Sequence, residues 1–227
     1  MFIALIVFCF SFSLQAASRP QQPEAADSAF KIVNKATSLG HYVPEDLVPF
    51  YDPRFTCWEV QISRRIIEDL CNLINAAQKA GLNLRVVSGY RSYEYQVECF
   101  ERWVERQLRD NPHWTRAKAE RRTNQFSAHA GHSEHQLGTV VDILSDENDY
   151  KFSTDKKWKF VGWLAENAKR FNFKISYPED SEEFEYEPWH LRWYPNSATS
   201  GLKNVMLVAA HKEGKKQLEK IRKKKKR

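Results

Sequence analysis

Two short segments of the chain contain residue types that together could build a hydrolytic zinc site. The segment 133–143 contains His135 and Asp142, and the tetrapeptide Glu-Pro-Trp-His at 187–190 contains Glu187 and His190. A catalytic zinc takes three protein ligands, accepts imidazole nitrogen and carboxylate oxygen, and keeps one position open for water. We therefore predict that His135, Asp142 and His190 bind Zn²⁺. Glu187 is close enough in sequence to act on a water at the metal as a general base.

Two predicted strands position these residues. The run 139–143 is apolar and β-branched, so it predicts a buried strand that carries Asp142, with His135 on the turn before it. The aromatic run 189–194 predicts a second strand, which carries His190. If the two strands are neighbours in one sheet, the three ligands can meet.

The order of these motifs resembles that of a known family. Ser-x-His-x-x-Gly-x-x-x-Asp from Ser133, Glu-x-Trp-His from Glu187, and Ser-Gly-Tyr-Arg-Ser-Tyr-Glu-Tyr-Gln upstream at 88–96 are similar to motifs of the VanY-type zinc D-alanyl-D-alanine carboxypeptidases. Relatives of that family include the VanX dipeptidases and several phage cell-wall endopeptidases. The resemblance covers roughly residues 50–195, and three ordered motifs are far more specific than one.

The resemblance implies a function and a role for each site residue. Zinc would bind His135, Asp142 and His190, and Glu187 would act as base and then as acid. Arg91 would hold the substrate carboxylate, a role that suits a bidentate guanidinium. Ser133 and Gln96 would make lesser substrate contacts. The implied protein is an exported zinc D,D-carboxypeptidase that acts on peptidoglycan stem peptides.

Other interpretations of the same residues stay open at this stage. A peptidoglycan endopeptidase would cut an internal bond, and a non-catalytic envelope-binding protein would keep the fold without the activity. Arg91 could instead form a surface ion pair, which is the commoner fate of an arginine. His129, His132 and His135 could form a different metal site on a helix, but Gly131 disfavours that helix. We expect His129 and His132 to lie on a loop near the mouth of the site.

The chain ends predict targeting segments outside the peptidase domain. Residues 2–14 are almost wholly apolar and uncharged, and Gln-Ala-Ala-Ser follows at 15–18, which indicates a signal peptide over residues 1–17. An uncleaved anchor is the alternative. Residues 18–29 predict a linker, 30–202 the zinc peptidase domain, and 203–227 a basic C-terminal tail. We therefore expect export to the periplasm, the cell envelope or the extracellular space.

The positive charge of the chain belongs to its tail. The net charge is +6, but residues 211–227 alone contribute +8, so the remainder sums to −2. Such a run is most often a solvated end. It could also attach the protein to an anionic envelope surface. Because the chain is expected to be exported, no nucleic acid partner is expected.

The cysteine content is compatible with export, but it does not determine which cysteines form a disulfide. Removal of the signal leaves Cys57, Cys71 and Cys99, an odd number, so we expect one disulfide and one free buried thiol in an oxidising compartment, with the pair unspecified. No Cys-x-x-Cys spacing for a metal or redox site is present.

The remaining patterns predict an α+β fold in a single domain, with a small, largely antiparallel sheet flanked by helices. Apolar residues recur at helical spacing over 60–79 and stop at Gly81. Residues 84–87 predict a strand and 93–108 a helix, while 114–124 form a charged, exposed connection of helical composition. A further helix is expected over 155–170, with Thr154 as its N-cap and a left-handed end at Asn172, followed by a strand over 173–177.

Overall fold

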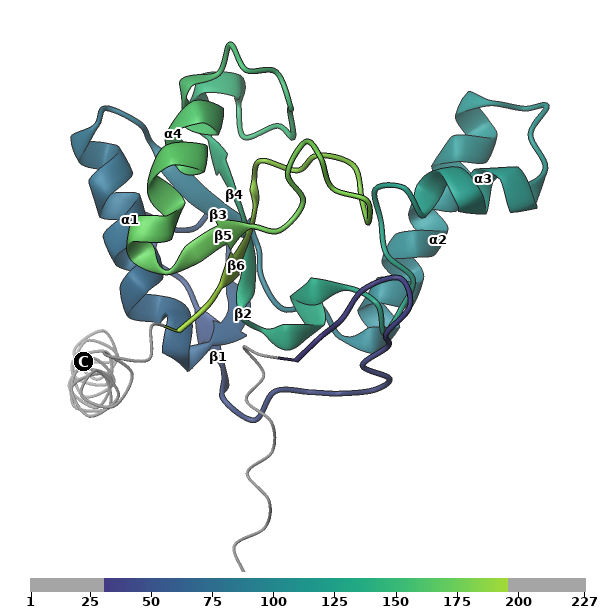
Figure 1. Ribbon diagram of the computed structural model, residues 1–227, viewed down its shortest axis with the longest axis horizontal. Helices are drawn as coiled ribbons and strands as arrows, with labels where there is room; N and C mark the ends of the chain where they lie inside the picture. Colours follow the sequence, from purple (N-terminus) through teal and green to yellow (C-terminus); the bar gives the residue numbers. More distant parts are fainter. Residues whose placement is uncertain (1–30, 196–227) are drawn as a thin grey trace, which may run out of the picture.

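Two of the three candidate ligands, Asp142 and His190, lie on a four-stranded sheet in which every neighbouring pair of strands is antiparallel. The computed structural model describes residues 31–195. The strand order is β3-β4-β6-β5, and a separate antiparallel pair, β1 and β2, packs nearby (Figure 1). The predicted α+β fold is therefore confirmed. The strands are β1 (Leu47–Phe50), β2 (Val60–Ser63), β3 (Leu84–Ser88), β4 (Val140–Ser145), β5 (Phe173–Ile175) and β6 (His190–Trp193).

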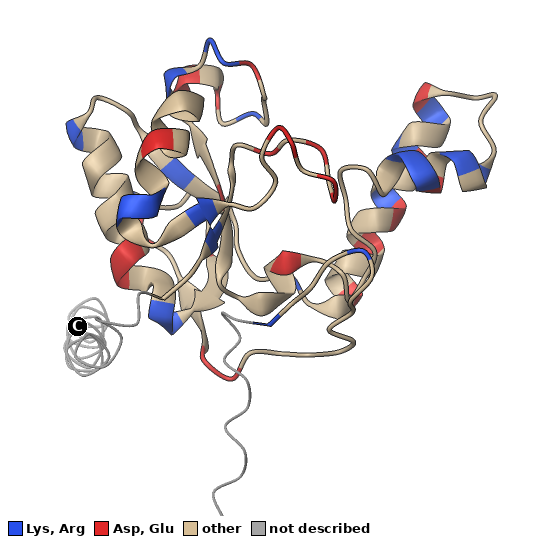
Figure 2. Ribbon diagram, viewed as in Figure 1, with Lys and Arg blue, Asp and Glu red and all other residues tan. Residues whose placement is uncertain are grey.

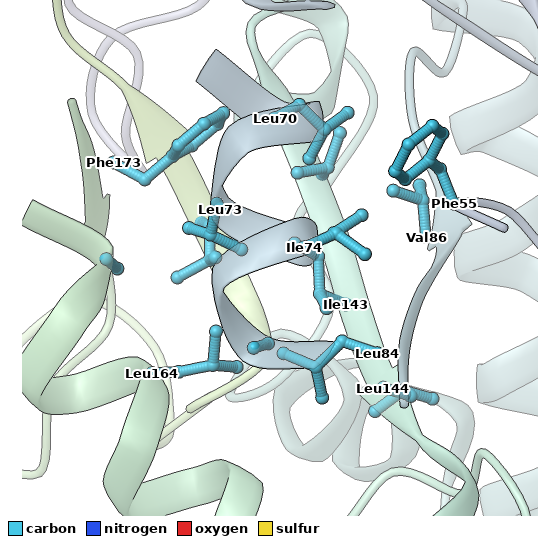
Figure 3. Packing of buried hydrophobic residues seen from close by; sticks show 14 of the residues in the cluster. Phe55, Leu70, Leu73, Ile74, Leu84, Val86, Ile143, Leu144, Leu164 and Phe173 are labelled. Carbon is cyan, nitrogen blue, oxygen red and sulfur yellow. The ribbon is translucent and has the colours of Figure 1, made fainter. Parts of the chain in front are cut away.

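Two helices complete the main hydrophobic core. The helix α1 (Ile67–Lys79) buries Leu70, Leu73 and Ile74, which recur at the spacing of one helical face. These side chains pack with Ile143 of β4 and with Leu164 of α4 (Lys159–Asn167) (Figure 3). The sheet therefore holds the site on a rigid, close-packed support.

The other two helices form an arm that extends from the body of the protein (Figure 1). They are α2 (Tyr93–Asp110) and α3 (Arg116–Thr123), and their own small core contains Phe100, Val104 and Ala119. The hydroxyl of Ser92 accepts a hydrogen bond from the backbone N–H of Tyr95 and so caps α2. The predicted helix over 93–108 is confirmed.

The helix predicted over 60–79 begins later than expected. Val60 to Ser63 form the strand β2, Arg64–Ile66 make a 3₁₀ turn, and α1 starts only at Ile67. Val60 and Ile62 are buried while Gln61 is exposed, which is the alternation of a strand, and β1 supplies the partner. Ile62 and Ile66 share helical spacing by coincidence. The predicted end is confirmed, since Gly81 follows α1 with a φ of 80°.

The helix predicted over 155–170 is shorter, and Thr154 does not cap it. The helix α4 begins at Lys159, and its N-cap residue, Trp158, makes no side-chain cap hydrogen bond. The carboxylate of Glu147 instead accepts from the backbone N–H of Phe160 at 3.1 Å, so a tertiary contact caps this end. A 3₁₀ turn (Ala168–Phe171) follows α4, and Asn172 adopts the predicted left-handed conformation with φ 63°.

The predicted disulfide does not form. Cys57, Cys71 and Cys99 are all free and partly buried; Cys57 lies in the loop before β2, Cys71 on α1 and Cys99 on α2. Cys57 and Cys71 pack against the main core as small apolar residues, whereas Cys99 lies on α2.

Several predictions concern residues beyond the described range. The signal peptide at 1–17, the linker at 18–29 and the basic tail at 203–227 all lie outside residues 31–195. Within the described range, no helix is both long and apolar enough to cross a membrane.

Candidate metal centre

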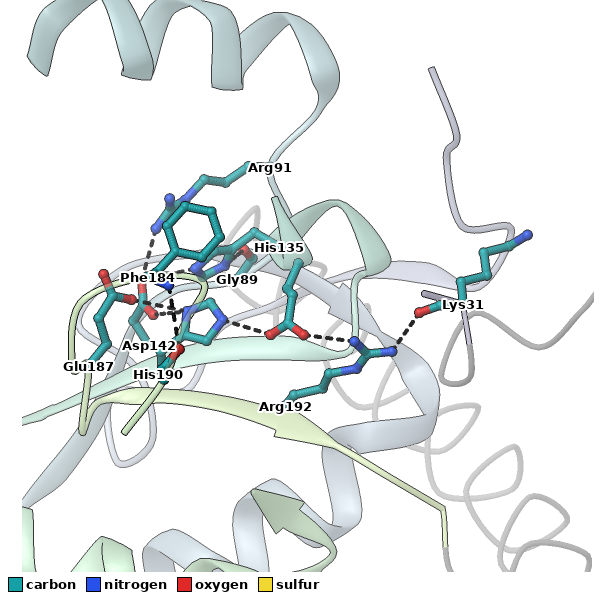
Figure 4. Close-up of polar contacts among 11 residues, drawn as sticks. Lys31, Gly89, Arg91, His135, Asp142, Phe184, Glu187, His190 and Arg192 are labelled. Carbon is teal, nitrogen blue, oxygen red and sulfur yellow. Dashed lines mark hydrogen bonds and ion pairs between the residues drawn. The ribbon is translucent and has the colours of Figure 1, made fainter. Parts of the chain in front are cut away.

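The structure brings the three predicted ligands together. One donor atom from each of His135, Asp142 and His190 lies within 4.8 Å of the other two, and all three side chains are buried. Asp142 on β4 is paired directly with His190 on β6, so both side chains project from the same face of the sheet. Figure 4 shows the two histidines converging on the Asp142 carboxylate.

Two glycines let the backbone place His135. The 3₁₀ turn Glu134–Leu137 carries this histidine and ends at Gly138, whose φ is 71°. A Cβ at Gly138 would lie 2.8 Å from a methyl carbon of Leu47. The carbonyl of Gly89, just after β3, accepts a hydrogen bond from His135 Nδ1 at 2.7 Å, and a Cβ there would lie 2.4 Å from the Gln61 carbonyl oxygen. A side chain at Gly89 would meet backbone, and one at Gly138 would have to adopt a left-handed conformation and displace Leu47.

Each histidine presents one ring nitrogen to Asp142 and has the other held by an acceptor. His135 Nε2 and His190 Nδ1 each lie 3.2 Å from an Asp142 oxygen. The opposite nitrogen of His190, Nε2, lies 3.1 Å from the Glu134 carboxylate. Outer acceptors of this kind fix the tautomer of metal-binding histidines. Two inward nitrogens and a buried carboxylate are a donor set that fits a divalent metal such as Zn²⁺.

Glu187 lies where a general base is needed. Its Oε2 is 3.6 Å from His190 Nδ1, and its backbone N–H donates to the Tyr177 carbonyl. Burial raises the pKa of Glu187 to about 7. Proton transfer near neutral pH is most efficient with a base of such a pKa.

The predicted substrate residues line a cleft of about 520 Å³ that reaches the three ligands. Arg91 donates to Asp142 Oδ2 at 2.8 Å and to the Ser88 hydroxyl. Ser133 is buried just before the 3₁₀ turn, and Gln96 donates to the Ala128 carbonyl at 2.7 Å. All three therefore border the cleft, while their contacts with substrate stay predictions.

Other histidines take no part in the cluster of three. His132 Nδ1 lies 2.8 Å from the Asn34 carbonyl oxygen, and His129 packs on the Phe100 ring with 4.1 Å between centroids. Both lie on the loop before the 3₁₀ turn, which confirms the predicted loop, but neither lines the cleft.

Sequence reasoning missed the residues that support the ligands. Ser88 lies opposite Asp142 in the β3–β4 register and accepts from Arg91. Glu134 contacts His190 and Arg192, and the Tyr177 ring stacks on His190 with 4.7 Å between centroids. One signal was available, because Arg192 is two residues after His190 and so shares its face of a strand.

The comparison with known families agrees with this geometry. The family model for VanY, D-alanyl-D-alanine carboxypeptidase, matches residues 59–196, which include every predicted site residue. The chain belongs to the VanY family. It is 36% identical to the protein YodJ of Bacillus subtilis over 188 residues, or 78% of this chain and 63% of YodJ. The chain spans less than two thirds of the length of the curated relatives it matches.

Solved structures that are similar to this chain include two of VanY proteins with a bound ligand and one of an LD-carboxypeptidase. VanYB in complex with D-alanine-D-alanine is 32% identical, with a TM-score of 0.61 over 74% of this chain and 87% of that one. A VanY glutamate-to-alanine variant in complex with Zn(II) is 32% identical, with a TM-score of 0.60 over 73% of this chain and 88% of that one. The LdcB LD-carboxypeptidase is 34% identical, with a TM-score of 0.60 over 73% of this chain and 76% of that one.

An acidic loop borders the cleft of this VanY-family chain. Figure 2 shows acidic residues along the segment between β5 and β6. Glu185 of this loop pairs with Arg122 of α3 at 2.6 Å, and its backbone N–H donates to the Gln125 carbonyl. The ion pair is partly exposed and contributes about 0.2–1 kcal/mol. This ion pair therefore holds the loop to the helical arm only weakly. The loop nevertheless ends at Glu187, the candidate general base.

Zinc binding to this VanY-family site is expected to release a proton. Burial would lower the pKa of His190, but hydrogen bonds with Asp142 and Glu134 outweigh burial and raise it to about 10 in the metal-free site. Below that pH the metal must displace the Nδ1 proton. The apparent zinc association constant should therefore rise about tenfold per pH unit between roughly pH 7.5 and 9. Calorimetry in buffers of different ionisation enthalpy would count the proton, and a pH-independent affinity would contradict the prediction.

Proposed function

We propose that this chain is an exported zinc metallopeptidase that hydrolyses the terminal D-Ala-D-Ala bond of peptidoglycan stem peptides. The observation that carries the proposal is a buried glutamate with a pKa of about 7 beside a buried His-Asp-His group. Membership of the VanY family supports it, as does the complex of VanYB with D-alanine-D-alanine.

The residues divide the chemistry between them. Zinc held by His135, Asp142 and His190 would acidify a water and polarise the scissile carbonyl. Glu187 accepts a proton from that water as its oxygen attacks the carbonyl carbon. Glu187 then donates the proton to the leaving amine nitrogen as the C–N bond breaks. One buried carboxyl with a pKa near 7 can serve both steps.

Arg91 gives the site its preference for a chain end. Its guanidinium lies at the cleft wall beside the metal ligands, and its side chain is 21% exposed. A guanidinium at that position can bind a free carboxylate through two N–H donors. Ser133 and Gln96 border the same cleft and add weaker contacts.

Replacing Arg91 with alanine should raise KM for a peptide with a free C-terminus by about 10- to 100-fold, the worth of hydrogen bonds to a charged group. The C-terminal amide of the same peptide should be a poor substrate for both proteins. Because Arg91 also contacts Asp142, zinc content is measured on the same samples. Arg91→Lys keeps the charge without the planar guanidinium, so its KM should lie between those of the wild type and Arg91→Ala. If the wild type cleaves the peptide acid and the peptide amide at equal rates, Arg91 does not recognise the C-terminal carboxylate.

Mass analysis of defined muropeptides, with and without chelator, tests the function directly. We expect the pentapeptide to lose one terminal alanine in a zinc-dependent manner. Cleavage of an internal bond would favour an endopeptidase, and binding without cleavage would favour a non-catalytic envelope protein. LdcB is as similar in fold as the VanY structures, so the tetrapeptide is a necessary comparison. Preferential release of alanine from the tetrapeptide would replace the D,D specificity with L,D specificity.

The proposed location follows from the first 17 residues. Cleavage after Ala16 or Ala17 would release the peptidase into the periplasm or beyond, where stem peptides occur. Sequencing the N-terminus of the mature protein tests this, since an intact Met1 would indicate a retained anchor. The basic tail would add attachment to an anionic envelope surface, and binding of the full chain to phosphatidylglycerol vesicles should weaken as salt rises.

A further inference from the structure

A buried carboxylate behind the metal centre connects two residues of the same strand. Glu134 Oε2 lies 3.1 Å from His190 Nε2, and Glu134 Oε1 accepts from Arg192 Nη1 at 2.7 Å. The side chains of Glu134, His190 and Arg192 are only 8%, 4% and 7% exposed. Arg192 Nη2 in turn donates to the Lys31 carbonyl at 2.7 Å (Figure 4). Both carboxylate oxygens are therefore engaged, and the guanidinium is itself anchored.

This arrangement constrains the imidazole from the side opposite the metal ligands. Once a metal has displaced the Nδ1 proton, the remaining N–H of His190 is Nε2–H, which donates to Glu134, and Nδ1, which faces Asp142 at 3.2 Å, carries the lone pair. The carboxylate cannot rotate away without breaking its contact with Arg192, and it is too deeply buried to exchange that contact for water. The ring is therefore held in one tautomer and one orientation.

We propose that Glu134 is a positioning residue for the metal centre, with Arg192 holding its carboxylate in place. Glu134 lies behind the ring, so it is neither a fourth ligand nor the base. The proposal rests on the zinc centre of the proposed function and adds a residue on which its affinity depends. Loss of such an outer partner typically weakens metal binding by about 10- to 100-fold.

The test compares zinc affinity in wild type, Glu134→Gln and a matched control, using competition with a chromogenic chelator. A glutamine cannot accept from both His190 and Arg192, because one side of its amide is a donor. We expect Glu134→Gln to weaken zinc binding by about 10- to 100-fold. The control is Asp69→Asn. Asp69 is also a buried acid tied to β6, accepting from Trp193 Nε1 at 2.8 Å, but it does not belong to the metal-binding group.

The control separates positioning from general loss of stability. Asp69→Asn should lower the melting temperature and leave zinc affinity within about twofold of wild type. The double variant Glu134→Gln/Arg192→Gln restores a complementary amide pair, so it should recover part of the lost affinity. If Glu134→Gln does not fold, the zinc affinity of the double variant is compared with that of the wild type and Asp69→Asn instead.

Visible spectra of the Co²⁺-substituted proteins give a readout independent of turnover. The spectrum should change in Glu134→Gln and stay unchanged in Asp69→Asn. Zinc affinity within twofold of wild type in Glu134→Gln, or an equal loss in Asp69→Asn, would overturn the proposal. A wild type that binds no zinc would instead refute the proposed function.

Discussion

Replacing Glu187 with alanine should lower kcat by about 10²- to 10⁴-fold, the usual contribution of a positioned general acid–base, while zinc stays bound. The side chain reaches to 3.6 Å from His190 Nδ1 without belonging to the three-ligand group. Its loss therefore removes proton transfer and leaves the donors in place.

Kinetics on a defined pentapeptide, together with zinc content by atomic absorption, check this result. The matched control is Glu185→Ala, two residues earlier on the same loop. Its partly exposed pair with Arg122 is weak, so turnover should change by no more than a few fold. Near-normal turnover in Glu187→Ala would show that another group takes the proton.

Replacing Asp142 with alanine should abolish stoichiometric zinc binding and reduce activity to that of the chelated wild type. This carboxylate is the group on which the site converges, since it faces His135 and His190 at 3.2 Å and accepts from Arg91 at 2.8 Å. Its loss removes a ligand and leaves the Arg91 guanidinium and the His190 imidazole in the site without their counter-charge. Such a change in a buried site typically costs about 3–5 kcal/mol of stability.

Zinc analysis after dialysis and thermal unfolding of the metal-free protein measure the two effects. Asp146→Ala is the matched control, because Asp146 directly follows β4 and accepts from Asn83 away from the ligands. It should keep its zinc and its activity. Retention of one tightly bound zinc by Asp142→Ala would show that the donor set is wrong.

Local patterns predicted which three candidate ligands the fold brings together, because each pattern is short and complete in itself. A turn with Gly138 leads His135 into an apolar strand that carries Asp142, and an aromatic strand carries His190. Pairing of the two strands was then the only tertiary assumption, and the register Asp142 opposite His190 satisfies it.

Features that depend on distant partners could not be obtained in this way. Glu134 looks like any acid beside a histidine until β6 brings Arg192 to it. The start of α4 is decided by Glu147, 13 residues before the backbone N–H that it caps, so the local preference for Thr154 had no effect. The late start of α1 has the same cause, since strand β1 pairs with residues that also fit a helical pattern.

The candidate metal centre can form only when the strands of the sheet pair in the native register. Ser88, Asp142 and His190 lie in one row across β3, β4 and β6, each opposite the next. A slip of one residue in the β4–β6 pairing would send Asp142 or His190 to the other face of the sheet, which breaks the ligand set. A metal ion that binds only the native register therefore adds its binding free energy to the stability of that register alone. Among the states open to a folding chain, the ion would therefore favour the one with the native register.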